Sequence, residues 1–156
     1  MNKTRRQILK RAGATGTLVA AFAAGLVRPQ RGFAAGWNKD AFGSKTLADA
    51  LKSLGAASPA DSNEIVIEAP QIAENGAVVP IEITSNLPGT RALFVLIEKN
   101  PFPLAAKFDF LEGSVPFVKV NVKMGESSNV RVVAEAGGKH YAAVKEVKVT
   151  IGGCGG

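Results

Sequence analysis

Apolar residues recur at every second position in six short runs of this 156-residue chain, and a seventh run is apolar throughout, a pattern that leaves few folds open to it. A period of two places alternate side chains on the same face of a β-strand, so each run predicts a strand. The runs lie at residues 64–69, 79–84, 92–97, 107–110, 118–124, 130–134 and 141–151. Turn-forming residues separate them, for example Asn75-Gly76 and Gly137-Gly138.

Short strands at this close spacing predict an all-β protein, an immunoglobulin-like antiparallel β-sandwich over residues 64–151. The chain has one cysteine, so no disulfide can join the two predicted sheets. The run at 92–97 is apolar on both faces and therefore needs cover on both. Either it is a central strand of the sandwich, or one of its faces meets a partner subunit.

One short helix is predicted ahead of the strands. The segment from Thr46 to Asp49 has the form of a capping box, leucines then recur at helical spacing, and Gly55 ends the run. Residues 56–63 are small and polar and include a proline, which predicts a connector. Residues 36–63 are thus expected to form an N-terminal helical segment and connector.

Residues 1–35 have the organisation of an export signal. Arg5-Arg6 precede a mildly apolar stretch at 12–27, and small residues follow. This order predicts a signal peptide that is cleaved after Ala34 or Ala35, and the twin arginine predicts export to the periplasm by the Tat pathway. The alternative is an uncleaved amphipathic anchor. The apolar stretch is short for a membrane span, so we expect the mature form to have no membrane association.

The formal net charge of +6 belongs to this leader. Seven of the 19 Lys and Arg residues precede residue 35, where no acidic residue occurs, and the remaining 12 face 13 Asp and Glu. The predicted mature chain is therefore nearly neutral, and we expect no nucleic-acid partner. The Tat pathway carries folded proteins. The sequence has no cofactor motif, so we expect no cofactor and infer a co-exported partner subunit instead.

The residues best suited to chemistry stand at the end of the sequence. The last predicted strand stops at Ile151, and Gly-Gly-Cys-Gly-Gly follows at residues 152–156. Glycine lacks a Cβ and allows nearly all backbone conformations. Four glycines therefore predict a flexible swinging arm around Cys154: Gly152, Gly153, Gly155 and Gly156. The extended reach from Ile151 to Cys154 is about 10 Å, at about 3.3 Å per residue.

Cys154 is predicted to carry an attached group rather than to catalyse. No side chain within four positions of it can act as a base or supply a positive charge. An ordinary cysteine thiol, with a pKa of about 8.5, is only a few per cent thiolate at pH 7. The thiol would then be activated inside the active site of a partner enzyme. An unpaired cysteine in an oxidising compartment also predicts a Cys154 disulfide-linked dimer.

Other chemistries suit the sequence less well. Ubiquitin-like sulfur carriers also end in Gly-Gly, but they are activated in the cytoplasm, whereas this leader predicts export. A CaaX prenylation site needs three residues after the cysteine, and only two follow Cys154. A small exported thiol oxidoreductase would need a second cysteine or a local base. A purely structural or adhesive β-sandwich would leave the terminal thiol unexplained.

The sequence predicts neither a metal site nor a catalytic residue in the chain. His140 is the only histidine, and one histidine with one cysteine cannot complete a usual zinc site. We expect His140 to be a surface residue of the last strand.

Three segments closely resemble the SoxY family, the sulfur-carrier subunits of the periplasmic thiosulfate-oxidising Sox system. They are residues 147–156 (VKVTIGGCGG), 69–80 (APQIAENGAVVP) and 98–104 (EKNPFPL). The resemblance covers nearly all of the predicted mature chain, and the final five residues are its most specific part.

The resemblance implies an immunoglobulin-like fold, a heterodimer with SoxZ and covalent transport of sulfur on Cys154. It also implies transient complexes with three enzymes. SoxAX, a haem enzyme, would join thiosulfate to the thiol; SoxB, a hydrolase, would release sulfate; and SoxCD, a molybdenum enzyme, would oxidise the sulfur that remains. In this cycle the carrier is a substrate rather than an enzyme.

Overall fold

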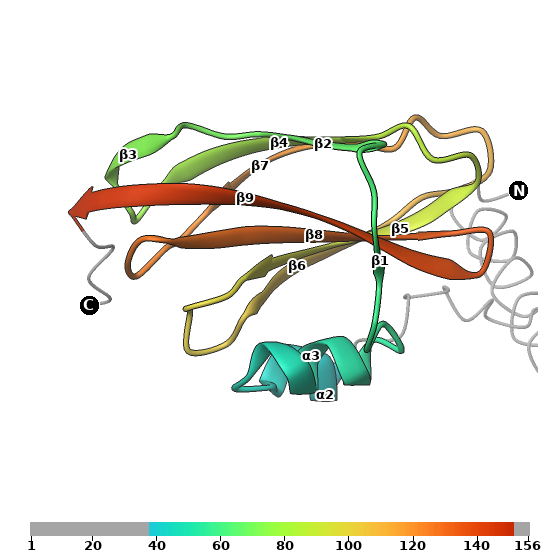
Figure 1. Cartoon of the computed structure of the whole chain (residues 1–156), viewed down its shortest axis with the longest axis horizontal. Helices are drawn as coiled ribbons and strands as arrows, with labels where there is room; N and C mark the ends of the chain where they lie inside the picture. Colours follow the sequence, from blue (N-terminus) through green and yellow to red (C-terminus); the bar gives the residue numbers. More distant parts are fainter. Residues whose placement is uncertain (1–37, 152–156) are drawn as a thin grey trace, which may run out of the picture. The chain divides into compact units, whose positions relative to one another are not determined.

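The computed structural model describes residues 38–151, and their strands form two facing sheets (Figure 1). The larger sheet runs in the order β1 (Ala60–Asp61), β9 (Lys139–Ile151), β8 (Ser128–Ala136), β5 (Thr90–Ile97) and β6 (Leu104–Asp109), and β3 (Ile72–Asn75) also pairs with β9. The smaller sheet runs β2 (Ile65–Glu68), β4 (Val79–Ser85) and β7 (Phe117–Val122). The predicted all-β sandwich of immunoglobulin-like type is confirmed, and each of the seven predicted strands is present.

The period-two alternation explains the core between the sheets. In β4, Val79, Ile81 and Ile83 are fully buried, and the residues between them face outward. They pack against alternate residues of the larger sheet, among them Leu93, Val95, Ile97, Val130 and Val132. Burial of these side chains is the main stabilising contribution to the sandwich.

Strand β5 is covered on both faces, as its sequence requires. Leu93 and its alternate neighbours face the sandwich core. Ala92, Phe94 and Leu96 face the other way, into a second apolar cluster formed with the N-terminal helices. Figure 1 shows those helices against the larger sheet, on the side away from the smaller one. The strand is central, between β8 and β6, and its second face meets the chain's own helices.

The two helices are α2 (Lys39–Gly43) and α3 (Leu47–Ser53). The predicted cap of α3 is confirmed: the Thr46 hydroxyl accepts from the Asp49 amide at 3.1 Å and donates to the Asp49 carboxylate at 2.7 Å. Gly55 follows with a φ of +71°, a conformation that favours glycine after a helix. Helix α2 was not predicted. Within residues 38–151, no helix is long and apolar enough to cross a membrane.

Two short strands depart from the antiparallel pattern. Strand β1 lies inside the predicted connector at 56–63, and β3 lies between two predicted strands. Both pair with β9 in the parallel sense, β1 at Tyr141–Ala142 and β3 at 148–151. The sheet is therefore mixed at its β9 edge, and β3 supports the end of the chain from which the predicted arm continues.

Candidate functional site

The predicted carrier residue Cys154 and the four glycines around it lie outside the described residues, as does the predicted signal peptide at 1–35. Their assignment therefore stays a prediction. The structure does show where the predicted arm begins. Strand β9 extends to Ile151, in agreement with the predicted strand end, and Cys154 follows three positions later.

Strand β9 changes its partner shortly before this point. Strand β8 pairs with it along residues 139–147, and β3 pairs with it from Lys148 to Ile151. The Lys148 amide donates to the Gln71 carbonyl at 3.0 Å, and the Gly76 amide donates to the Ile151 carbonyl at 2.9 Å. The backbone is thus held by hydrogen bonds as far as Ile151. In Figure 1, β3 lies beside the tip of β9.

Side chains reinforce this attachment. The Thr150 hydroxyl donates to the Glu74 carbonyl at 3.0 Å. The Val149 amide donates to the Ser127 hydroxyl at 2.9 Å, which extends the contact with the β7–β8 connection beyond the end of the β8 pairing. Ala73, the one buried residue of β3, packs in the core. These contacts fix the position of Ile151 relative to the sandwich.

The turn between β3 and β4 joins this end of β9 to the smaller sheet. The Asn75 side chain accepts from the Ala77 amide at 2.8 Å, in an Asx-type turn. The Gly76 carbonyl accepts from the Met124 amide at 2.7 Å. Gly76 therefore contacts β9 through its amide and the end of β7 through its carbonyl, and the two sheets are connected next to the start of the predicted arm.

Three apolar side chains near this end of the sandwich are exposed: Ile72 is 58% exposed, Val78 57% and Ile151 68%. Ile72 and Ile151 point to opposite faces of the larger sheet, because Ile72 pairs with Lys148 and successive side chains of β9 alternate between the two faces. Sequence analysis did not identify Ile72 or Val78. They lie in the 69–80 segment that resembles the SoxY family, but the resemblance alone gives them no role.

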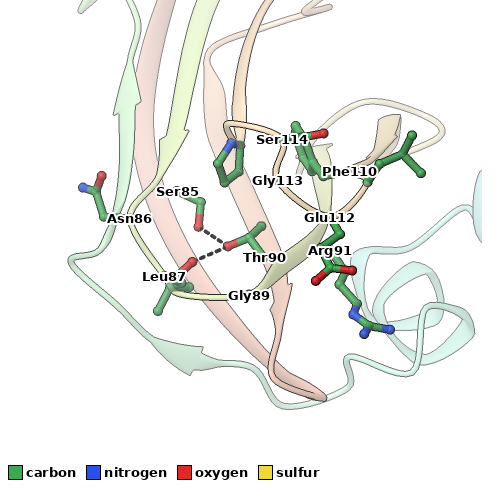
Figure 2. Close-up of a pocket in the computed structure, with 12 residues that line it drawn as sticks. Ser85, Asn86, Leu87, Gly89, Thr90, Arg91, Phe110, Glu112, Gly113 and Ser114 are labelled. Carbon is green, nitrogen blue, oxygen red and sulfur yellow. Dashed lines mark hydrogen bonds between the residues drawn. The ribbon is translucent and has the colours of Figure 1, made fainter.

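A separate cavity of about 610 Å³ lies at the opposite end of the sandwich, between the β4–β5 turn and the β6–β7 loop (Figure 2). Thr90, at the cavity, pairs with Ala136 of β8, which pairs in turn with Lys139 at the start of β9. Ile151 is at the other end of β9. At about 3.3 Å per strand residue, the cavity is therefore about 40 Å from Ile151. The Ser85 and Thr90 hydroxyls are 2.8 Å apart, and Thr90 donates to the Leu87 carbonyl. The Ser85 and Thr90 hydroxyls are therefore already engaged in hydrogen bonds within the protein.

The described residues offer little reactive chemistry. Across 38–151, no three His, Cys, Asp or Glu side chains are grouped so as to hold a metal ion. His140 is half-buried, with its ring 6.5 Å from that of Phe94, so it is less exposed than predicted. The pKa of Lys119 is raised, by its hydrogen bond to Glu82 and then by the charge of that carboxylate. This ion pair is on the surface and contributes little to stability.

A family model and a solved structure point to the same family. The family described as "Sulfur oxidation protein SoxY" matches residues 50–154, a span that ends at Cys154. The solved structure of the sulfur carrier protein SoxY from Chlorobium limicola f thiosulfatophilum is 39% identical, over 72% of this chain and 99% of that chain, with a TM-score of 0.62. No curated protein sequence matches the chain.

A superoxide reductase (neelaredoxin) from Ignicoccus hospitalis is also similar, at 19% identity, over 56% of this chain and 80% of that chain, with a TM-score of 0.50. At that identity the likeness concerns the fold alone. The family match and the carrier from Chlorobium support a carrier subunit rather than an enzyme. On a family match over most of its length, the chain belongs to the SoxY family of sulfur oxidation proteins.

Proposed function

We propose that this protein carries sulfur intermediates covalently on Cys154 during thiosulfate oxidation in the periplasm, without catalysing a step itself. The observation that carries the proposal is the family match, which extends as far as Cys154. The 39% identical carrier from Chlorobium supports it. The firm attachment of β9 as far as Ile151 supports it further, since the thiol would start from a fixed point three residues away.

The chemistry requires only an accessible thiol from the carrier. The thiolate and thiosulfate lose two electrons to the haem enzyme as a sulfur–sulfur bond forms. Water then cleaves the terminal sulfonate as sulfate and leaves a persulfide on the cysteine. The molybdenum enzyme would then take six electrons from the outer sulfur, with three waters as the oxygen source, to give a cysteine S-sulfonate. A second hydrolysis releases sulfate and restores the thiol. Activation belongs to the partner active sites.

The proposal includes partners and a route. SoxZ would form the permanent heterodimer and cross the membrane together with this chain, whose twin-arginine leader provides the export signal. SoxAX, SoxB and SoxCD would bind in turn and only transiently. The near-neutral charge after residue 34 accords with binding to proteins rather than to nucleic acid.

Replacement of the thiol tests the proposal. Cys154→Ser should abolish sulfur loading by the thiosulfate-joining enzyme and leave the melting temperature unchanged. Intact-protein mass spectrometry of the heterodimer after incubation with thiosulfate and that enzyme would detect the adduct. A sulfur adduct on the Cys154→Ser protein would refute the assignment.

A relocated thiol is the matched control. Cys154→Ser combined with Lys52→Cys puts an exposed cysteine on helix α3, where a small thiol reagent can reach it. The enzyme should leave this thiol unloaded because it is not at the end of the predicted arm. Loading at position 52 as fast as at position 154 would show that the position of the thiol does not matter.

A further inference from the structure

We propose that Asn75 is a site of spontaneous deamidation whose rate is set by the pairing between β3 and the end of β9. The closed pairing protects the asparagine, and each opening exposes it to a change of its side chain that cannot be reversed. This reaction is independent of any group that Cys154 carries.

The sequence supplies the reactive pair of residues. Asn75 is the one asparagine of the chain that is followed by glycine. Deamidation begins when the main-chain nitrogen of the next residue attacks the side-chain carbonyl carbon of the asparagine. Glycine hinders this approach least, because it has no Cβ and its backbone turns easily. In an unfolded chain, Asn75 is therefore the asparagine most prone to deamidation.

The reaction needs only water. The Gly76 nitrogen gives up its proton to hydroxide and bonds to Cγ of Asn75, and the side-chain nitrogen leaves as ammonia. The product is a five-membered succinimide ring. Water then opens the ring at one of its two carbonyl carbons, which gives either aspartate or isoaspartate at position 75. No electrons are gained or lost, so no oxidant or reductant takes part.

The attacking nitrogen is occupied in the folded protein. Gly76 is buried, and its amide donates to the Ile151 carbonyl at 2.9 Å. Its carbonyl accepts from the Met124 amide at 2.7 Å, so the residue is held from both sides. A buried amide whose proton is hydrogen-bonded does not meet solvent hydroxide until the structure opens. The Ile151 carbonyl thus protects the neighbouring asparagine from attack.

Access to the side chain is not the barrier. Asn75 is exposed, so water reaches it in the folded protein. Its side-chain oxygen accepts from the Ala77 amide at 2.8 Å, which fixes the orientation of the side chain without covering it. The step that folding prevents is therefore the release of the Gly76 amide.

The pairing that protects this amide is short. Strand β3 has four residues, of which only Ala73 is buried, and it pairs with β9 over residues 148–151. Short pairings with few buried contacts open locally while the rest of a protein stays folded. Because ring closure is slow compared with reclosing, the deamidation rate equals the rate in the unfolded chain multiplied by the fraction of time that the pairing is open.

The two products differ in their effect on the fold. Aspartate keeps a side-chain oxygen that accepts the Ala77 amide, so the turn persists. Isoaspartate adds a carbon atom to the main chain next to Gly76. The Gly76 amide and carbonyl then no longer reach Ile151 and Met124 together, and the end of β9 loses its support. Opening of the pairing is reversible, whereas the formation of isoaspartate makes the loss of support permanent.

The test compares two proline variants of the whole protein. Lys148→Pro removes the amide that donates to the Gln71 carbonyl in the β3–β9 pairing. Ser62→Pro is the matched control, since it removes the amide that donates to the Ala142 carbonyl, next to β1 at the other end of the same strand. Proline has no amide hydrogen to donate. The melting temperature of each variant verifies that it is folded during the assay.

Peptide mass spectrometry after incubation at mildly alkaline pH measures aspartate and isoaspartate at position 75, with wild type unfolded in urea as the reference. We expect folded wild type to react at least about tenfold more slowly than the reference. Lys148→Pro should react at least about tenfold faster than folded wild type, and Ser62→Pro should stay within about twofold of it.

Hydrogen exchange in wild type keeps the proposal testable if Lys148→Pro does not fold. The exchange of the Gly76 amide and the deamidation of Asn75 need the same opening, so folding should slow both by factors that agree within about threefold. Three results would overturn the proposal: deamidation of folded wild type at the unfolded rate, equal rates in the two proline variants, or an exchange rate that folding slows far more than it slows deamidation.

Discussion

Ile151 is the residue at which the chain passes from paired strand to the predicted arm. Its carbonyl accepts the Gly76 amide, and Gly152 and Gly153 follow. The contrast is chemical: β-branched residues on β9 favour an extended, hydrogen-bonded backbone, whereas glycine imposes no such preference. One residue therefore separates the part of the chain that holds its position from the part proposed to carry the thiol.

Gly153→Val should slow sulfate release by the hydrolase about tenfold while it leaves the melting temperature within about 1 °C of wild type. Valine restricts the backbone and adds bulk next to Cys154, and a narrow recess tolerates neither. Steady-state kinetics with the loaded carrier measures the effect. Gly153→Ala serves as the control with less bulk and should show a smaller loss. Turnover of the valine variant equal to wild type would contradict the role given to the glycine.

At the scale of elements, β5 connects the sandwich to its helical cover. Leu93 and Val95 belong to the core between the sheets, and Phe94 belongs to the cluster beneath the helices. One strand thus contributes to two apolar clusters. The helices cover the outer face of the larger sheet, and their loss would expose large apolar side chains such as Phe94 and Leu96.

Phe94→Ala should lower the free energy of unfolding by about 3 kcal/mol, the range for a buried aromatic cut back to alanine. Phe94 is 3% exposed, whereas Phe117 on the outer face of β7 is 48% exposed. Phe117→Ala is therefore the matched control and should cost less than about 1 kcal/mol. Urea denaturation of both variants measures the difference. Equal losses would show that the helices do not bury Phe94 against the sheet in solution.

Sequence patterns predicted the elements whose apolar residues recur at a regular spacing and missed the short elements that lack such a spacing. Strand β4 shows its alternation over seven residues. Strand β3 has four residues, of which only one is buried, and β1 has two residues, so neither shows an alternation of apolar residues. Helix α2 has five residues, too few to repeat a helical period. Strands β1 and β3 also depend on parallel pairing with β9, which starts more than 60 residues later in the sequence, so local residues carry no sign of it.

At the scale of the whole molecule, the cavity between the β4–β5 turn and the β6–β7 loop and the start of the predicted arm lie at opposite ends of the sandwich. The thiol and its glycines were predictable from sequence because five adjacent residues contain them. The support for the end of β9 was not predictable, because β3 meets residues 148–151 only through the parallel β3–β9 pairing. The site thus combines a local motif with a platform that only the fold assembles.

Lengthening the arm tests whether its short reach matters to the whole molecule. Insertion of Gly-Gly-Ser after Ile151 raises the extended reach from about 10 Å to about 20 Å. The looser tether lowers the effective concentration of the thiol at a partner's active site. We expect kcat/KM for sulfate release by the hydrolase to fall moderately and the melting temperature to stay unchanged. Steady-state kinetics with the loaded carrier measures the effect. A lengthened carrier with a higher kcat/KM than wild type would mean that the natural arm is too short for the active site, and the advantage given to a fixed starting point at Ile151 would then be wrong.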